Sequence, residues 1–384
     1  MKYLVLFLFL FFSSLNAQNS NKKILWNKTD NVPVEFATIK SKGQYLLSNS
    51  EGIFEFFENQ DLTIQCLGYN SLELQYKDLI SKDTIYMQPK IFEMEEVVIV
   101  AEDIYQKMVK TILSEYALEP HSEKFYLRVV VKRNEELYKI IDFSGYVEKQ
   151  TLFGTSQKPY PKNNYKVQIN NVRKVGKEDR TIDYGLYNFN EFFTVIAAVV
   201  LKPDIYKLKY EISDDNTISK IVARPKEPEN NFTNGFYILN EDNTIGNAQI
   251  TSNWISSPYL KIGKHKHRTT YYYKNTSFER NVVSNKMQLD KSIIKAITEV
   301  ITKDEEKQVF EATYFYSSNP VQDIVVKDNV NLKKDIFKIN MNYNEDYWKQ
   351  IDKILPLTKE MQEFVNKINL EEKNKEFRTI SNFR

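Results

Sequence analysis

Glycine, cysteine and histidine are scarce in this sequence of 384 residues, which contains 10 glycines, one cysteine and three histidines. So few glycines leave no glycine-rich phosphate-binding loop, and the patterns G-x-S-x-G and H-E-x-x-H do not occur. The single Cys66 cannot form an internal disulfide, and its apolar neighbours predict a buried thiol without a nucleophilic role. The motifs that mark several common classes of enzyme are therefore missing.

Long apolar runs and an excess of one charge are missing as well. Beyond residue 17, the longest apolar segment covers about ten residues at 192–201, which is shorter than a membrane-spanning helix requires. The 53 Lys and Arg residues nearly balance the 51 Asp and Glu residues, which argues against a nucleic-acid partner. The basic cluster at 264–268 predicts the solvated face of a strand. We expect a mature protein that is soluble or peripheral to a membrane.

The first 17 residues form a pattern of their own. Lys2 precedes an apolar run at residues 4–12, and small residues lead to Ala17. This order is typical of a secretory signal peptide, and the lack of a cysteine nearby argues against a lipid anchor. We therefore expect an exported protein, located in the periplasm, associated with the outer membrane, or secreted.

Residues 32–100 contain short segments in which apolar and polar side chains alternate, separated by turn residues. Val34, Phe36 and Thr38 alternate with their neighbours, and Gly52 follows Asn49 where a tight turn favours positive φ. This pattern predicts a small antiparallel β-sandwich of about seven strands.

The motifs in this region resemble a known family. They are P-x-x-F-A-T-I from Pro33, N-x-x-G-x-F from Asn49, L-G-Y ending at Tyr69, and E-x-V-V-I-V ending at Val100. They are similar to the carboxypeptidase-regulatory-like, or transthyretin-like, domain found in exported and outer-membrane proteins of Bacteroidetes-type bacteria. The resemblance covers residues 23–100 and implies a non-catalytic accessory module. The zinc and substrate residues of carboxypeptidases are absent, so no such activity is implied.

The rest of the chain divides into three parts. After a sandwich domain at residues 18–100, apolar side chains at helical spacing predict a connecting helix within 101–124. Residues 125–340 predict about ten antiparallel strands in meander order, including a strand at 282–289, with turns at 214–216, 241–243 and 274–276. A helix at 190–201 interrupts these strands. The final segment, 341–384, predicts two helices separated at Pro356, with Tyr347 and Trp348 either docking on the β domain or binding a partner.

A shorter stretch at 220–245 resembles outer-membrane lipoprotein carriers, in which a long antiparallel sheet surrounds a helix as a half-barrel that shelters acyl chains. The resemblance implies an apolar ligand beside the helix at 190–201, and its candidate contacts are Phe192, Phe193 and Ile196. The alternative is that these side chains form an ordinary core with the aromatic strands. Both interpretations stay open from the sequence.

Histidine offers little for catalysis. His265 and His267 would share one face of a strand, but a third metal ligand is not evident and the neighbouring lysines disfavour a cation. His121 is predicted at the surface. We therefore expect a mainly β, non-catalytic cell-envelope protein without cofactors, whose β domain binds a protein partner, a lipid or a glycan. The alternatives are a lipid or lipoprotein carrier, and a glycosidase-like enzyme whose two carboxyl groups come from distant strands.

Overall fold

The computed structural model describes residues 21–374 and 379–381, except for 43, 67, 90–93, 98–100, 156–157, 178–183, 200, 214–218, 229–232 and 342. The predicted signal peptide therefore lies outside the described residues. The fold is mainly β, with 49% strand and 16% helix, as the sequence predicted. It forms two compact units, one comprising Met1–Ile91 with Glu345–Gln362 and the other Phe92–Asn344 with Glu363–Arg384.

The first unit is a β-sandwich of two four-stranded sheets. One sheet contains β2 (Val32–Pro33), β1 (Lys22–Asn27), β5 (Ile53–Glu55) and β8 (Thr84–Met87). The other contains β4 (Gln44–Leu47), β3 (Thr38–Ser41), β6 (Leu62–Gln65) and β7 (Leu72–Leu74), and the short helix α2 (Tyr76–Ile80) follows it. The sandwich is confirmed, but β1 and β8 pair in parallel, so the prediction of a purely antiparallel arrangement was wrong.

Turn and core residues explain why this small unit folds. Gly52 has φ +74°, and a Cβ there would lie 2.3 Å from the carbonyl oxygen of Leu25, so only glycine fits. The Asn49 side chain accepts hydrogen bonds from the backbone of Glu51 and Ile53 and fixes the same turn. Cys66 is half-buried at the edge of the sandwich core rather than fully buried, because its strand ends at Gln65.

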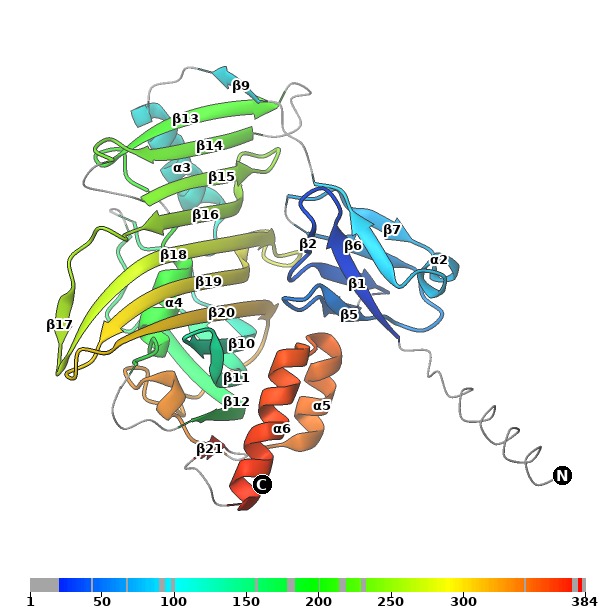
Figure 1. Cartoon of the computed structure of the whole chain (residues 1–384). Helices are drawn as coiled ribbons and strands as arrows, with labels where there is room; N and C mark the ends of the chain where they lie inside the picture. The colour runs from blue at the N-terminus through cyan, green and yellow to red at the C-terminus, as the bar shows by residue number, and fades with distance from the viewer. Residues whose placement is uncertain are drawn as a thin grey trace. The chain divides into compact units, whose positions relative to one another are not determined.

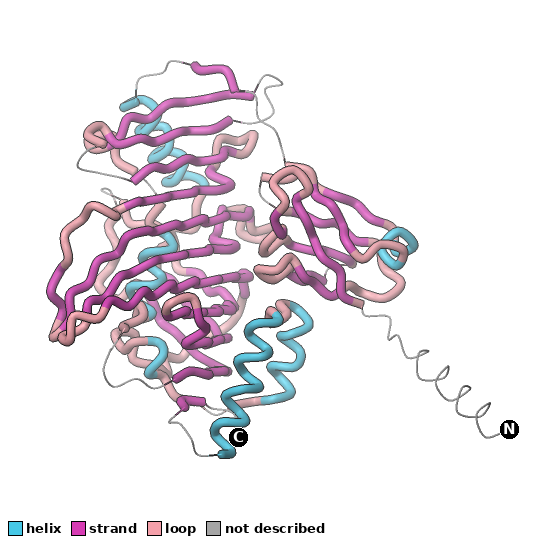
Figure 2. Tube along the Cα trace, viewed as in Figure 1, coloured by secondary structure: helices cyan, strands magenta, loops and turns pink. Residues whose placement is uncertain are grey.

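The second unit is built on one antiparallel sheet of 13 strands, shown in Figures 1 and 2. Its order begins β21 (Thr379–Ser381), β12 (Tyr165–Lys177), β11 (Glu136–Lys149), β10 (His121–Arg133), β20 (Lys307–Val321) and β19 (Met287–Ile301). It continues with β18 (His265–Arg280), β16 (Ile245–Asn253), β15 (Thr233–Leu239), β14 (Ser219–Pro225), β13 (Tyr206–Ser213) and β9 (Met94–Val97), while β17 (Leu260–Ile262) pairs with β18. The described strands form an open path from β21 to β9.

Three details of the strand prediction were wrong. The order is not one meander, because β10 pairs with β20 and so separates β12 from β13. Residues 281–286 form a turn, fixed by the Asn281 side chain accepting from the backbone of Val283 and Ser284, and the strand begins only at Met287. The expected turn at 274–276 lies inside β18. The turn at 241–243 is confirmed, and that at 214–216 lies outside the described residues.

The segment at 94–97 also differs from the prediction. The sequence placed it in the N-terminal sandwich, but it forms β9, which pairs with β13 at the edge of the large sheet. The pairing joins Val97 to Tyr210 and Glu95 to Ile212. A strand pattern reveals a pairing edge but not its partner, which is why the sequence assigned this strand to its neighbours in the chain.

Two helices share the core on one face of the sheet. They are α3 (Ala101–Glu115) and α4 (Phe189–Ala197), and apolar side chains of both lie in the main core cluster with inward-facing strand residues (Figure 1). Both are shorter than predicted. The connecting helix was expected to end before Pro120 but ends at Glu115, and α4 ends where Ala198 leaves the helical conformation. A short 3-10 helix, η1 (Ile336–Lys338), also contributes to this core.

The C-terminal segment forms α5 (Glu345–Ile354) and α6 (Lys359–Asn374), and the predicted break at Pro356 is confirmed. The Trp348 side chain is fully buried. The sequence suggested that Tyr347 and Trp348 dock on the β domain or bind a partner, but α5, which carries them, packs on β4 and β5 of the sandwich, and Ile354 packs against the sandwich core. The apolar face of α5 was recognisable, whereas its partner was not.

Candidate functional site

The three predicted apolar contacts lie together in the core of the large unit. Phe192, Phe193 and Ile196 all project from α4 and are at most 1% exposed. The Phe193 ring lies 5.7 Å from the Phe125 ring, and the Phe192 ring lies 5.8 Å from that of Tyr314. Aromatic rings from the strands therefore occupy the space beside this face of α4. None of the three residues lines the pocket described below.

Both ends of α4 are held by hydrogen bonds. At its start, Asn188 and Glu191 form a capping box, in which each side chain accepts from the other's backbone N–H. At its end, the Lys274 amine donates to the carbonyl oxygens of Val195, at 2.9 Å, and Ala198. A cation is favourable at a helix C-terminus, although burial lowers the pKa of Lys274 to about 7. These contacts fix α4 against the sheet.

A buried polar cluster lies near the same helix. Lys149 Nζ is 2.7 Å from Glu123 Oε2, and the Tyr316 hydroxyl donates to the same oxygen at 3.1 Å. Burial opposes ionisation of Glu123, but the nearby Lys149 ammonium lowers the carboxyl pKa to about 2 overall. His121 was predicted at the surface, yet it is half-buried with Nε2 3.4 Å from Glu123 Oε1. Glu123 and Lys149 are at most 2% exposed, so we assign them a structural role.

A second buried cluster joins β10, β11 and β12. Asp142 Oδ1 accepts from Arg128 Nε at 2.9 Å, and Asp142 Oδ2 accepts from Arg173 Nε at 2.8 Å. Burial raises the pKa of Asp142, but the two guanidinium groups together lower it by more than burial raises it. The net shift of the pKa is therefore downward. This arrangement links three neighbouring strands and presents no reactive atom to solvent.

The histidine pair on β18 lacks partners for metal binding. The ring centroids of His265 and His267 are 6.4 Å apart. Across the part of the chain that the structure describes, no group of three or more His, Cys, Asp or Glu side chains is placed to hold a metal ion. Within the same residues, no helix is both long and apolar enough to cross a membrane.

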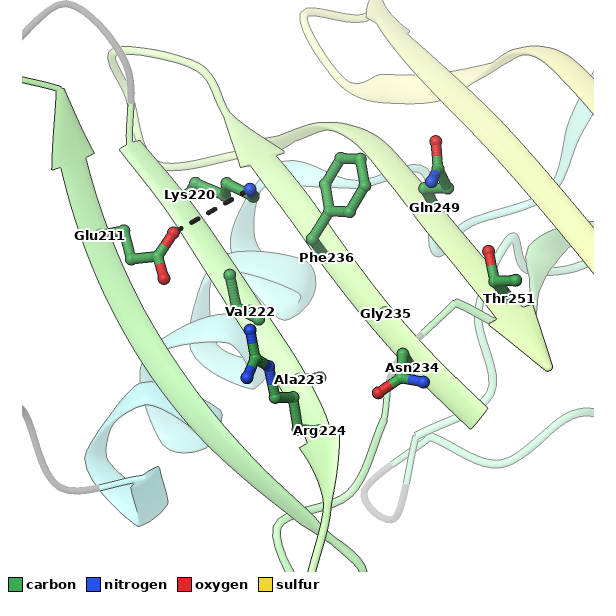
Figure 3. A pocket seen from close by; sticks show the side chains of 10 residues that line it. All are labelled: Glu211, Lys220, Val222, Ala223, Arg224, Asn234, Gly235, Phe236, Gln249 and Thr251. Atoms are coloured by element: carbon green, nitrogen blue, oxygen red, sulfur yellow. Dashed lines mark ion pairs between the residues drawn. The ribbon is translucent and has the colours of Figure 1, made fainter. Parts of the chain in front are cut away.

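A pocket of about 530 Å³ lies on the opposite face of the sheet from α3 and α4. Side chains alternate between the two faces of each strand. Ile221, Ala223 and Tyr237 point into the core, so their neighbours along β14 and β15 point to the outer face. Figure 3 shows the ten residues that line the pocket, which come from β13, β14, β15 and β16. They are Glu211, Lys220, Val222, Ala223, Arg224, Asn234, Gly235, Phe236, Gln249 and Thr251.

Phe236 occupies the middle of this pocket. Its backbone pairs with Val222 on one side and with Gln249 on the other. The Lys220 amine lies 4.9 Å from the centroid of the Phe236 ring and 4.0 Å from Glu211 Oε2. The one acidic side chain of the lining is thus already paired with a cation (Figure 3).

Hydrogen-bond donors surround Phe236. Within the described residues, the side chains of Arg224, Asn234 and Thr251 make no hydrogen bond or ion pair. The Gln249 carbonyl oxygen accepts from the Tyr273 hydroxyl at 3.3 Å, which leaves its amide N–H groups available. The pocket therefore combines an aromatic ring with several donors and a net positive charge. This combination suits a ligand rich in oxygen atoms and negative charge.

This pocket was not predicted from the sequence. Residues 220–245 carried only a resemblance in fold, and the predicted ligand contacts lie on α4 instead. The available signal was the alternation of Lys220, Val222 and Arg224 with core residues, together with an aromatic side chain at the outward position 236. The hollow itself depends on four strands side by side, and no local pattern shows that.

The chain matches no family model, and no curated protein is significantly similar to it.

Proposed function

We propose that this protein is a non-catalytic binding protein of the bacterial cell envelope, and that the pocket around Phe236 binds an acidic glycan. The observation that carries the proposal is the unengaged set of donors beside an aromatic ring on the outer face of the sheet. Pockets of this size commonly hold small ligands or short segments of larger ones. The described residues offer no comparable constellation for acid–base or nucleophilic chemistry at this place.

Each part of the pocket has a role in this proposal. The Arg224 guanidinium would hold a sugar carboxylate through two parallel hydrogen bonds. The amides of Asn234 and Gln249 would bind hydroxyl groups, since each amide N–H donates to oxygen. Phe236 would contact the apolar face of a sugar ring. No bond in the ligand is broken.

Export and the role of the sandwich complete the proposal. The pattern of residues 1–17 supports a signal peptide, and the motifs at 23–100 support an accessory domain of carboxypeptidase-regulatory-like type. In this scheme the sandwich acts as an adaptor to an envelope protein partner, and the large sheet binds the ligand.

A titration of the purified protein with polygalacturonate and with its methyl ester tests the proposal. We expect binding to the acid and at least about tenfold weaker binding to the ester, because the ester lacks the charge that Arg224 would pair with. Arg224→Met and Phe236→Ala should each weaken binding about tenfold or more. Lys303→Ala removes an exposed cation from another turn and should have no effect. Equal binding of acid and ester would contradict the proposal.

A lipid carrier is the second candidate, because an open sheet packs one face against two helices. The dense packing of Phe192 and Phe193 gives it less support than the outer pocket receives. Native mass spectrometry of protein purified gently from its host distinguishes the two. A stoichiometric bound lipid would favour the carrier, whereas a lipid-free protein that takes up no lipid would count against it.

A further inference from the structure

An apolar hairpin extends from the sheet at the β17–β18 connection (Figure 1). Ile255, Leu260 and Ile262 are exposed to 61%, 65% and 59%, respectively. The two strands turn at Gly263 and Lys264, and Gly263 has φ +60°. Glycine at the first position of a two-residue turn is typical of a type II′ hairpin. Leu260 and Ile262 thus lie in solvent on the hairpin itself, and Ile255 lies in the turn that precedes it.

The two faces of this hairpin differ in character. Leu260 pairs with His267 and Ile262 pairs with His265, so these four side chains share one face. Lys261 pairs with Lys266 on the opposite face. His267 also pairs with Val300, which is buried in the core, so the apolar face of the hairpin continues the inner face of the sheet.

The charge of this segment is one-sided, although the whole chain is nearly balanced. Residues 253–268 include Lys261, Lys264, Lys266 and Arg268 and contain no Asp or Glu. The three lysines lie at or beside the exposed tip, whereas Arg268 pairs with Glu299 at the base. The hairpin therefore presents aliphatic side chains flanked by cations. The adjoining turn between β19 and β20 contains Asp304, Glu305 and Glu306, so the positive charge belongs to the hairpin and not to its neighbour.

The base of the hairpin is firmly attached. Glu299 Oε2 accepts from the Tyr259 hydroxyl and from Arg268 Nη2, both at 2.6 Å. The Trp254 backbone donates to Thr270, and its indole stacks on the Tyr272 ring at 6.2 Å. An exposed tip on such a base is held in an extended position, so its apolar side chains do not fold back into the core.

We propose that the β17–β18 hairpin docks the protein on an anionic lipid surface by inserting Leu260 and Ile262 between headgroups. Aliphatic side chains gain by leaving water, and lysines that flank them reach the phosphates while their methylene groups stay near the apolar boundary. Each cation near an anionic membrane surface adds about fivefold to the affinity. The three lysines of the hairpin itself favour an anionic surface over a neutral one.

Co-sedimentation with vesicles tests this proposal. The full chain is mixed with vesicles of phosphatidylcholine alone or of phosphatidylcholine with phosphatidylglycerol, and the bound fraction is measured. We expect binding to the mixed vesicles and at least about tenfold weaker binding to the neutral ones. Leu260→Ser with Ile262→Ser should lower the affinity about tenfold or more, and so should Lys261→Glu with Lys264→Glu.

The chain offers a matched control in another hairpin tip. Val282 and Val283, in the turn between β18 and β19, are 97% and 71% exposed. Val282→Ser with Val283→Ser removes a similar apolar surface and should leave vesicle binding unchanged. All these sites are exposed, so the variants should fold, and a thermal unfolding curve verifies this.

Three results would overturn the proposal. The first is no sedimentation with either vesicle, which would leave a protein partner as the occupant of the tip. The second is an equal loss in the valine control, which would show unspecific adsorption. The third is a loss in the lysine variant alone, which would show binding by charge without insertion.

Discussion

The side-chain amine of Lys274 on β18 lies 2.9 Å from the carbonyl oxygen of Val195 near the end of α4. A lysine from the middle of a strand thus adds to the hydrogen bonding of a helix end, where the Ala198 backbone N–H already donates to Thr194 and Val195. This contact offsets part of the cost of burying a lysine at a site that is only 3% exposed. It also has a consequence for the dependence of stability on pH.

Lys274 should make stability rise with pH. Its pKa is lowered from 10.5 to about 7 in the folded protein, so between these values the unfolded chain binds more protons than the folded one. The free energy of unfolding should therefore increase by up to about 1.4 kcal/mol per pH unit in this window. Urea unfolding at several pH values above 7 measures the slope. Lys274→Met should lack this contribution, and an unchanged slope would refute the assignment.

Glu123 should make stability fall at acidic pH. Its pKa falls from 4.5 to about 2 on folding, so the stability it contributes is fully present above 4.5 and is lost as the pH falls towards 2. Glu123→Gln should remove this acid sensitivity. At neutral pH it should also destabilise the protein by about 3–5 kcal/mol, because Lys149 is left buried and unpaired. Replacing Lys149 by Met in the same chain should recover part of that loss, as measured by urea unfolding.

Phe193 should matter for stability more than for ligand binding. Phe193→Ala should cost about 3–5 kcal/mol, since the removed ring packs against Phe125, Tyr165 and Tyr316. Glycan binding by the folded fraction should not change, because Phe193 does not line the outer pocket. Chemical unfolding and a binding titration measure the two effects separately. A stable variant that has lost a bound lipid would instead support the carrier.

Gly52→Ala should destabilise the sandwich more than Gly68→Ala. Both glycines have positive φ, but only Gly52 faces a backbone atom, at 2.3 Å from the position of the added Cβ. At Gly68 nothing lies within 4 Å, so the substitution there adds only the strain of positive φ, about 1 kcal/mol. Thermal unfolding of both variants compares the two, and equal losses would show that the close approach at Gly52 is readily relieved.

The sequence predicted individual elements better than their partners. The alternation around Phe36 and the spacing of Phe192, Phe193 and Ile196 are local signals, and the corresponding sandwich and core helix are present. The parallel pairing of β1 with β8 and the pairing of β10 with β20 join distant segments, for which no local pattern exists. Val282 and Val283 have strong β propensity, yet the Asn281 side chain fixes a turn there. Propensity is thus overridden by a specific hydrogen bond.

The pocket around Phe236 could not be predicted from the sequence for a related reason, because it too joins separate strands. Residues 220–224 show the alternation that places Lys220 and Arg224 outward, but most outward residues of any sheet are simply solvated. Only the combination with Asn234 and Phe236 on β15 and Gln249 on β16 makes a pocket. By contrast, the aliphatic and basic residues of the β17–β18 hairpin are contiguous in sequence, and the structure adds only their exposure.

The pairing of β10 with β20 also affects the order of folding. Val130 lies opposite Thr313, so the centre of the large sheet joins strands from the two ends of this unit. During synthesis, β10, β11 and β12 can form a meander early, but one edge of β10 remains unpaired until β20 has emerged. Domains dominated by such distant contacts fold slowly. A chain arrested before residue 307 should therefore expose an unpaired strand edge that is prone to aggregation, and it should depend on a chaperone.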